Sequence, residues 1–302
     1  MAGLRLLPWL KLLRIAALPS ALSNILVGYL LAHQSWQPIL PLVLLLIASA
    51  CLYCSGMVLN DVFDVEVDRK QRPNRPLPSA AISPSQAKAV GMGLLLAGPV
   101  LAALASPLSL GIAAALAALV YLYDGPLKRT PIAPLLMGGC RSLNILLGAS
   151  TIGVIPAVVL WYAVAIGVFV AGVTWLAKRE ADKTQSLTLM LPGSVLMVIG
   201  LVLVFVTAWR FAPSDPLNPR LVYLLPIAIA LIAMPILRRL LIAWSVASGK
   251  AIQATVISSL RSLIIFDACL GLLVANGRPL FSAAILGLIA VSLLLGRVTK
   301  LT

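Results

Sequence analysis

Residues 39–60 read ILPLVLLLIASACLYCSGMVLN, and residues 61–68 continue as DVFDVEVD. The first stretch carries no charged side chain and is as long as the roughly 20 residues that a helix needs to cross the hydrocarbon core of a bilayer. A lone strand would leave backbone groups without partners in lipid, so the stretch predicts a transmembrane helix. Acidic residues follow directly where this helix leaves the membrane, which points to the functional end of the molecule.

Comparable apolar segments recur along the whole chain. Hydrophobic residues make up 61% of the 302 residues and charged residues 11%, whereas about 25% of a soluble domain is charged. The mean hydropathy is +1.05, so the bilayer must be the solvent of this fold. We predict an all-α, polytopic transmembrane helical bundle in which residues 1–302 form one domain. Its predicted spans are 15–32, 39–60, 86–105, 107–123, 132–153, 156–177, 189–210, 221–242, 252–275 and 280–296.

The span count has two solutions, nine or ten. Ten spans put the N-terminus and most of the 23 basic residues on one side, which the positive-inside rule identifies as the cytoplasm. Nine spans would omit the segment 252–275, which carries Arg261 and Asp267, and would leave Arg297 and Lys300 on the outside, so we prefer ten. Topology and attraction to anionic lipid also account for the net charge of +14. Membrane lipid is therefore an expected partner and nucleic acid is not.

The acidic residues gather at the predicted cytoplasmic end. One acidic stretch follows the second predicted span and another follows the sixth. Because four spans separate them, we predict two four-helix repeats around a central cavity, with both stretches at one end. Seven of the nine acidic residues belong to this end, namely Asp61, Asp64, Glu66, Asp68, Asp124, Glu180 and Asp182.

The first acidic stretch has the spacing of a helical face. Asp61, Asp64 and Asp68 are related as i, i+3 and i+7 if the helix continues through them. Oxygen ligands of this kind suit Mg²⁺, which keeps several waters and binds one or two carboxylates plus substrate phosphates. Arg72 and Arg75 follow and could grip a diphosphate. The alternative is an acidic helix end that is neutralised by its own basic neighbours.

These residues resemble the first signature of the UbiA superfamily of intramembrane prenyltransferases. That signature reads NDxxDxxxD, then an arginine, then RPLPSG, and residues 60–78 follow it closely. The sequence departs at Ala80, where glycine is usual. Residues 14–31 and 123–130 are similar to the first helix and to a basic loop of the family. Residues 137–148 resemble the EboC-like branch, which implies the inner membrane of a bacterium.

The second family signature, DxxxD, is altered in this chain. The corresponding residues are Lys178-Arg179-Glu180-Ala181-Asp182-Lys183-Thr184. Thr184 stands where the second carboxylate belongs. The resemblance implies that Glu180 takes the first ligand position, with Asp182 as a substitute partner. This departure puts the second metal site in doubt and leaves open a weakened activity.

The resemblance implies Mg²⁺-dependent transfer of a prenyl group from an isoprenyl diphosphate to a lipophilic, aromatic acceptor within the membrane, with the active site on the cytoplasmic side. Mg²⁺ would offset the charge that develops on the leaving diphosphate. The implied metal ligands are Asp61, Asp64, Asp68 and Glu180. The implied catalytic set adds Asp182 to these four. The implied diphosphate-binding residues are Asn24, Asn60, Arg72, Arg75, Lys128, Arg129 and Arg141.

Some of these residues have a second interpretation. Asn24 could equally make a polar contact between helices. Arg141 lies inside a span and needs a partner or a functional place. Asp124 could serve as a base or bind the acceptor, but Asp124-Gly125-Pro126 is also an ordinary turn sequence. Asp267 is interpreted as structural.

Three other functions compete with that of a prenyltransferase. A transporter should carry acids near mid-span, where only Asp267 lies. A CDP-alcohol phosphatidyltransferase should continue Asp124-Gly125 into a longer motif, which this sequence lacks. A family member that has lost catalysis and only binds an isoprenoid or another lipid stays possible because of the altered second signature.

Overall fold

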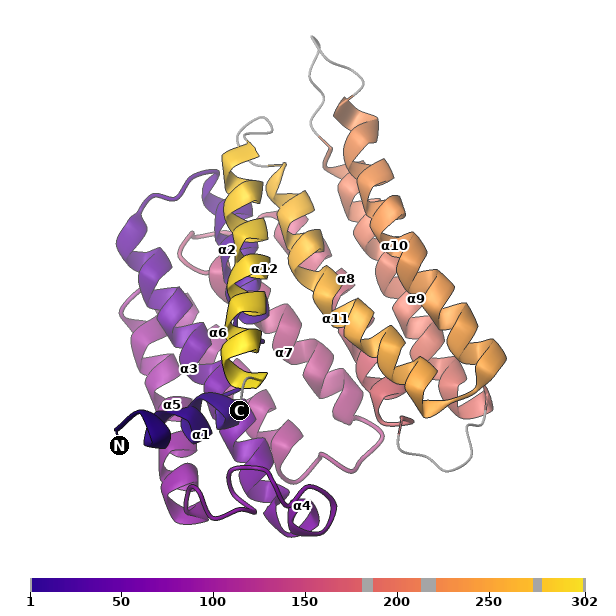
Figure 1. Ribbon diagram of the computed structural model, residues 1–302. Coiled ribbons are helices and arrows are strands. Elements are labelled where there is room, and N and C mark those ends of the chain that lie inside the picture. The colour runs from indigo at the N-terminus through magenta and orange to yellow at the C-terminus, as the bar shows by residue number, and fades with distance from the viewer. Residues whose placement is uncertain (1, 181–186, 213–220, 274–278, 301–302) are drawn as a thin grey trace.

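The structure is a computed structural model that describes residues 2–180, 187–212, 221–273 and 279–300. In these ranges the chain forms helices and no strand (Figure 1). The helices are α1 Ala2–Leu12, α2 Pro19–His33, α3 Ile39–Phe63, α4 Val65–Gln71, α5 Pro84–Ala103, α6 Pro107–Asp124, α7 Ala133–Gly148, α8 Ala157–Ala177, α9 Leu187–Arg210, α10 Leu221–Val246, α11 Gly249–Gly271 and α12 Pro279–Lys300.

Each of the ten predicted spans corresponds to a helix, so the all-α transmembrane prediction is confirmed. Among the described residues, eight helices are long and apolar enough to cross a membrane: α3, α5, α6, α8, α9, α10, α11 and α12. The other two, α2 and α7, have 15 and 16 residues. The predicted segment 15–32 is shortened because α2 begins only at Pro19, a residue suited to a first helical turn.

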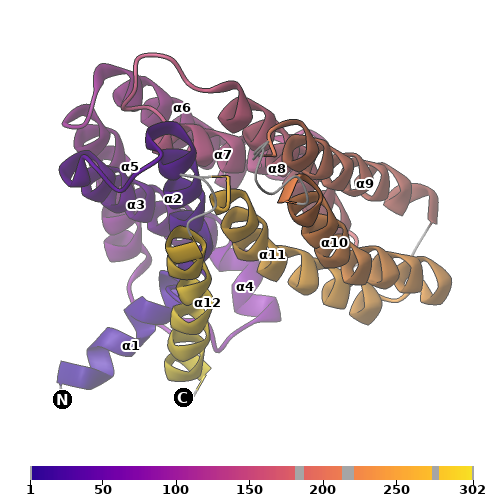
Figure 2. The same ribbon diagram turned by 90° about the horizontal axis from the view of Figure 1, so that it is seen from above.

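The bundle consists of two similar units. One is α2, α3, α5 and α6, and the other is α7, α8, α9 and α10. In the first unit α3 packs against α2 and α5, and α5 packs against α6; in the second, α8 packs against α7 and α9, and α9 against α10. This matching order is the predicted pair of four-helix repeats. Helix α11 packs against α2, α8 and α10, and α12 lies beside α2 and α11 (Figures 1 and 2).

Helices α2 and α7 join the two units at very close range. A Cβ atom on Gly28 of α2 would overlap the carbonyl oxygen of Ile145 on α7, and a Cβ on Gly148 of α7 would overlap the carbonyl oxygen of Ile25 on α2. Small residues at a helix interface let backbones approach in this way, which is typical of packing in membranes. We call this glycine-lined contact the α2–α7 seam.

The outer faces of the helices are apolar. Large hydrophobic side chains such as Leu96 of α5, Leu241 of α10 and Leu293 of α12 are exposed. A soluble monomer rarely exposes so much apolar surface, whereas lipid tails accept it. The protein is therefore an integral membrane protein.

Candidate active site

The acidic stretch lies at the end of α3 and in α4. Helix α3 ends at Phe63, Asp64 adopts φ −92° and ψ 0°, and α4 resumes at Val65. The Asp64 amide still donates to the carbonyl oxygen of Asn60 at 3.1 Å, and the Asp68 amide donates to that of Asp64 at 2.8 Å. The backbone thus continues in a nearly helical path, as the spacing of the aspartates requires.

Two of the three aspartates converge on one cation. Asp61 and Asp68 are buried, with 5% and 3% of their surface exposed. Arg75 Nη1 lies 2.6 Å from Asp68 Oδ2 and 3.3 Å from Asp61 Oδ1. Arg14 Nη2 reaches the same Asp61 oxygen at 2.8 Å. A single guanidinium nitrogen therefore occupies a position that two buried carboxylates share.

The third aspartate faces a different cation. Asp64 forms an ion pair with Lys128, which lies in the loop between α6 and α7. The Lys128 ammonium also donates to the side-chain oxygen of Asn60. Glu66 points elsewhere, as the spacing predicts, and pairs with Arg69 at 2.7 Å on the outside. The cluster thus consists of Asn60 and three aspartates held by cations from three separate segments.

The residues present fit a divalent cation at the Asp61–Asp68 pair. Their carboxylate oxygens are hard ligands, they are shielded from bulk water, and they already meet at one cationic nitrogen. In the described part of the chain no group of three or more acidic, histidine or cysteine side chains is placed to hold a metal ion. Arg75 and Lys128 instead hold the carboxylates apart as two sets.

The basic loop after α4 folds back over this cluster. Leu77 and Ile82 are buried against Leu12 and Val58, which anchors the loop to the bundle. Ala80 has φ 57°, in the left-handed region. Glycine adopts this region without strain, which gives a physical reason for the glycine that the family signature usually carries here.

Other predicted phosphate ligands lie farther out. Arg72 is 60% exposed in its side chain and stands 3.9 Å from Asp68. Arg129 is exposed and lines a separate surface hollow together with Lys178, Trp175 and Arg179. Arg75 and Lys128 therefore face the acidic cluster, Arg72 lies at its exposed edge, and Arg129 faces the separate hollow.

The second acidic stretch begins just after α8. Lys178 donates to the carbonyl oxygen of Thr130 at 3.0 Å, so the end of α8 lies beside the loop that carries Lys128. Glu180 is half-buried at the end of the described segment. Asp182, the predicted substitute ligand, lies outside the described residues. Burial lowers the pKa of Lys178, and the neighbouring charge of Arg179 adds to this effect.

A buried polar network connects Asn24 and Arg141 to Asp267. Arg141 Nη1 donates to the Asn24 side-chain oxygen at 3.2 Å, and the Asn24 amide donates to Asp267 Oδ2 at 2.8 Å. Asp267 also accepts hydrogen bonds from Ser23 and Tyr162, each at 2.6 Å. Sequence reasoning considered these residues one by one and missed their connection, because α2, α7, α8 and α11 contribute them from distant parts of the chain.

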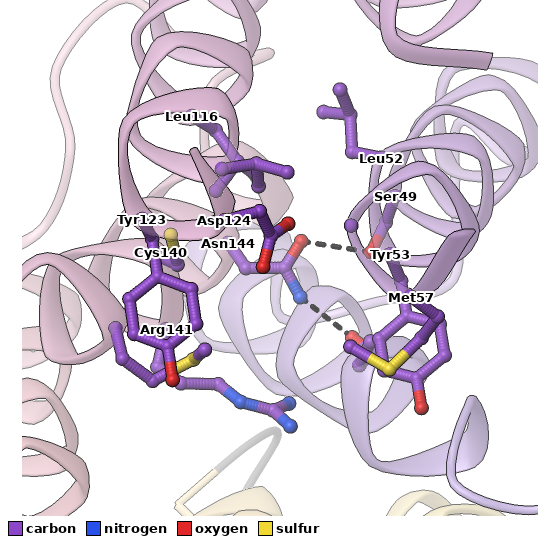
Figure 3. A pocket seen from close by; sticks show the side chains of 14 residues that line it. Ser49, Leu52, Tyr53, Met57, Leu116, Tyr123, Asp124, Cys140, Arg141 and Asn144 are labelled. Atoms are coloured by element: carbon purple, nitrogen blue, oxygen red, sulfur yellow. Dashed lines mark hydrogen bonds between the residues drawn. The ribbon is translucent and has the colours of Figure 1, made fainter. Parts of the chain in front are cut away.

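An apolar cavity opens between α2, α3, α6 and α7 (Figure 3). It comprises about 590 Å³ of empty space, including the part open to the outside. Asn144 is fixed in its wall, accepting from Ser49 Oγ at 2.8 Å and donating to the Ala21 carbonyl at 2.8 Å. The lining residues are Ala21, Ser49, Leu52, Tyr53, Gly56, Met57, Leu116, Val120, Tyr123, Asp124, Met137, Cys140, Arg141 and Asn144.

Sequence analysis missed Tyr53 as a cavity residue. It precedes Asn60 by seven residues and Asp61 by eight, so it lies two helical turns deeper on the same face of α3. That spacing is a signal that could have identified it.

The arrangement defines a class of membrane protein: a helical bundle with an apolar cavity and, at the end of α3 and in α4, a cluster of paired acidic and basic groups. A model of the UbiA prenyltransferase family matches residues 21–260, and the chain belongs to this family. The sequence is 40% identical over 107 residues to the digeranylgeranylglyceryl phosphate synthase of Methanoculleus marisnigri, covering 35% of this chain and 38% of the relative. The corresponding synthase of Methanopyrus kandleri is 32% identical over 153 residues, 51% of this chain and 56% of that protein.

These matches span less than two thirds of the relatives' own lengths. The fold is similar to that of a UbiA homolog from Archaeoglobus fulgidus, with a TM-score of 0.68, 17% identity and coverage of 94% of this chain and 99% of the other. The same homolog bound to DMAPP and Mg²⁺ gives a TM-score of 0.61 at 20% identity, with the same coverage. At these identities the likeness concerns the fold.

Proposed function

We propose that this protein is a Mg²⁺-dependent prenyltransferase that moves a prenyl group from an isoprenyl diphosphate to a lipophilic acceptor within the membrane. The observation that carries the proposal is the position of Arg75 between the buried carboxylates of Asp61 and Asp68. A cation is already held there, and helix α3 carries both Asp61 and one wall of the apolar cavity. Membership of the family and the names of the curated relatives support the same activity.

Asp61, Asp64 and Asp68 would hold Mg²⁺, and Glu180 and Asp182 would supply a second set of oxygen ligands. When bound, Mg²⁺ supplies the positive charge that offsets the charge growing on the departing diphosphate. The homolog from Archaeoglobus fulgidus with DMAPP and Mg²⁺ supports this choice of ion and donor.

The chain's own cations would bind the diphosphate. Arg75 and Lys128 are already held at the acidic cluster, so their N–H groups would turn from the carboxylates to phosphate oxygens in charge-assisted hydrogen bonds. Arg72 lies at the exposed edge of this cluster and Arg129 faces the separate hollow, and the network of Asn24 and Arg141 lies deeper, at the cavity wall. Walls formed by residues such as Leu52 and Leu116 exclude the water that would otherwise quench an allylic cation.

The proposal also covers the side of the membrane that the active site faces and the chemical class of the acceptor. Residues 1–302 act as one domain whose active site faces the cytoplasm, where the positive-inside rule puts Lys128 and Arg75. The bacterial inner membrane and the aromatic acceptor stay predictions. The names of the relatives make a prenylated glyceryl phosphate a second acceptor worth testing.

The test uses purified protein with Mg²⁺, geranylgeranyl diphosphate and a panel of lipophilic acceptors, with diphosphate release and prenylated products measured. Asp61→Asn should reduce turnover by about 100-fold or more, because it removes charge stabilisation at the leaving group. Glu66→Gln, which removes an exposed carboxylate from the same stretch, should leave turnover unchanged. Normal turnover by Asp61→Asn would contradict the proposal. Binding without turnover in the unaltered protein would favour a lipid-binding family member instead.

A further inference from the structure

Asp124 is a buried carboxylate at the cavity that the metal and diphosphate assignments do not use. It is the last residue of α6, with 3% of its surface exposed, and Gly125 follows it. Figure 3 shows its carboxyl group pointing from α6 toward the opposite wall of the cavity, where α3 carries Ser49 and Tyr53.

The carboxylate of Asp124 has no partner among the residues that the structure describes. Asp61, Asp64, Asp68 and Asp267 each accept at least one hydrogen bond from a side chain. No hydrogen bond or ion pair reaches the side chain of Asp124 from these same ranges of the chain. A buried carboxylate without a donor is costly, and buried polar groups are nearly always hydrogen-bonded. The position therefore calls for a donor from outside the described residues, and the cavity in front of it gives a ligand access.

The position of Asp124 along the cavity restricts the chemical class of the missing hydrogen-bond donor. Lys128, four residues on, pairs with Asp64 at the acidic cluster. On the other side, Leu116 and Leu52 begin the apolar wall. Gly56 of α3 leaves open the space in front of Asp124, because a Cβ there would lie 3.4 Å from Asp124 Oδ2. Asp124 thus lies where the acidic cluster meets the apolar cavity.

The reacting carbon of the prenyl diphosphate, C1, belongs at the same boundary. A diphosphate bound at Arg75 and Lys128, with its prenyl chain in the cavity, has its C1–oxygen bond at this boundary. The group that attacks C1 then lies within reach of Asp124. A hydroxyl group can donate a hydrogen bond to a carboxylate, whereas an aromatic C–H cannot satisfy it.

We infer that Asp124 is the general base of the reaction and that the acceptor is a lipophilic molecule with a free hydroxyl group, an inference that rests on the proposed function. The acceptor oxygen forms a bond to C1 of the prenyl group. The bond from C1 to the diphosphate oxygen breaks, and its electron pair leaves with the diphosphate. The hydroxyl proton passes to the Asp124 carboxylate and then to water.

Charges around Asp124 come from several elements. The charged side chains that act on Asp124 are Lys128 in the loop after α6, Arg14 before α2, and Asp64 and Asp61 of the α3–α4 stretch. Arg75 and Lys128 hold these two aspartates as ion pairs.

The test compares purified wild-type protein with Asp124→Asn and, as control, Glu66→Gln. The donor is geranylgeranyl diphosphate with Mg²⁺. The acceptors are a glyceryl phosphate with one prenyl ether and one free hydroxyl, a long-chain alkylphenol, and the O-methyl ether of each. The Asp124→Asn variant should transfer the prenyl group about 100-fold or more slowly, the usual contribution of a general base, while its binding of the prenyl diphosphate is unchanged and its thermal stability does not fall. Formate should raise transfer by Asp124→Ala, because it can replace the missing carboxylate.

The possible outcomes distinguish the role of Asp124, the chemical class of the acceptor and the proposed function itself. Transfer by Asp124→Asn at the wild-type rate overturns the role of Asp124 and leaves the prenyltransferase in place. Should Asp124→Asn not be recovered folded, the wild-type protein still decides, since prenylation of an O-methyl ether overturns the hydroxyl class. A wild-type protein that releases no diphosphate with any acceptor overturns the proposed function, and this inference with it.

Discussion

Arg75 Nη1 donates to Asp68 Oδ2 at 2.6 Å and thereby folds the basic loop back over the end of α4. This contact joins the two halves of one sequence signature, the acidic half and the RPLP half. The halves neutralise each other in the structure, which is the interpretation that competed with a metal site. Both interpretations hold, one after the other, if Mg²⁺ and diphosphate separate Arg75 from Asp68: the halves neutralise each other in the free protein, and they bind metal and diphosphate when the substrate is present.

Replacement of Arg75 tests two roles of this residue separately: competition with Mg²⁺ for the carboxylates, and binding of the diphosphate. In Arg75→Gln the carboxylates of Asp61 and Asp68 lose a cation, and breaking a buried pair costs about 3 kcal/mol of folding free energy. Mg²⁺ alone should then bind more tightly, because its competitor is gone, while geranylgeranyl diphosphate should bind more weakly. Thermal unfolding in detergent, titrated with each ligand, measures both. Equal Mg²⁺ stabilisation of Arg75→Gln and wild type would contradict the competition.

Ala80→Gly should stabilise the protein. Ala80 has φ 57°, a conformation that costs an L-residue about 1–2 kcal/mol. The greater freedom of glycine in the unfolded chain takes back about 0.4–1 kcal/mol, so a small net gain is expected. Ala81→Gly is the matched control, because Ala81 is not at positive φ and glycine there brings only the loss. Thermal unfolding of both variants checks the sign, and a lower midpoint for Ala80→Gly would show that its φ is not strained.

Asp267→Asn should weaken the network beneath Arg141. Three side chains donate to Asp267, and an asparagine amide would leave buried donors unpaired at a cost of about 1–3 kcal/mol. Release of the Asn24 amide also frees its contact with Arg141. Tyr162→Phe, which removes one donor, should cost less. Thermal unfolding gives the stabilities, and an unchanged midpoint for Asp267→Asn would argue that the network carries no stability.

Gly148→Ala should disrupt the α2–α7 seam. The added methyl group would overlap the backbone of Ile25, and overpacking of this kind costs about 1–3 kcal/mol. Gly93→Ala in α5 is the control, since nothing lies within 4 Å of a Cβ there and alanine is the better helix former. Opposite shifts in the unfolding midpoint are expected, and a shift in the same direction would contradict the close approach at the seam.

The fold could be predicted from the sequence because length and hydropathy alone identify spans. Where the prediction was less accurate, the reason was local. Residues 15–18 were counted with a span on apolarity, but the helix starts at Pro19. The residues after Gly148 were counted with α7 for the same reason, although the helix ends there. Hydropathy does not report where a helix begins or ends.

The site was predictable only in part. The i, i+7 spacing placed Asp61 and Asp68 together, and the structure brings both to Arg75. The spacing could not tell that Asp64 turns toward Lys128, which is 64 residues away. The network of Asn24, Arg141 and Asp267 was out of reach for the same reason, because contacts across long stretches of chain depend on how the helices pack. Tyr53 was predictable from its spacing and was overlooked.

The α2–α7 seam bears on whether the two four-helix units can move relative to each other. A carrier that alternates between two open states needs its halves to rock against one another. At the seam the two backbones lie too close to admit a methyl group at Gly28 or Gly148, as is typical where small residues line an interface between membrane helices. Close packing of the two units at the seam is what a fixed site between them needs, whereas a carrier must loosen this contact in every cycle.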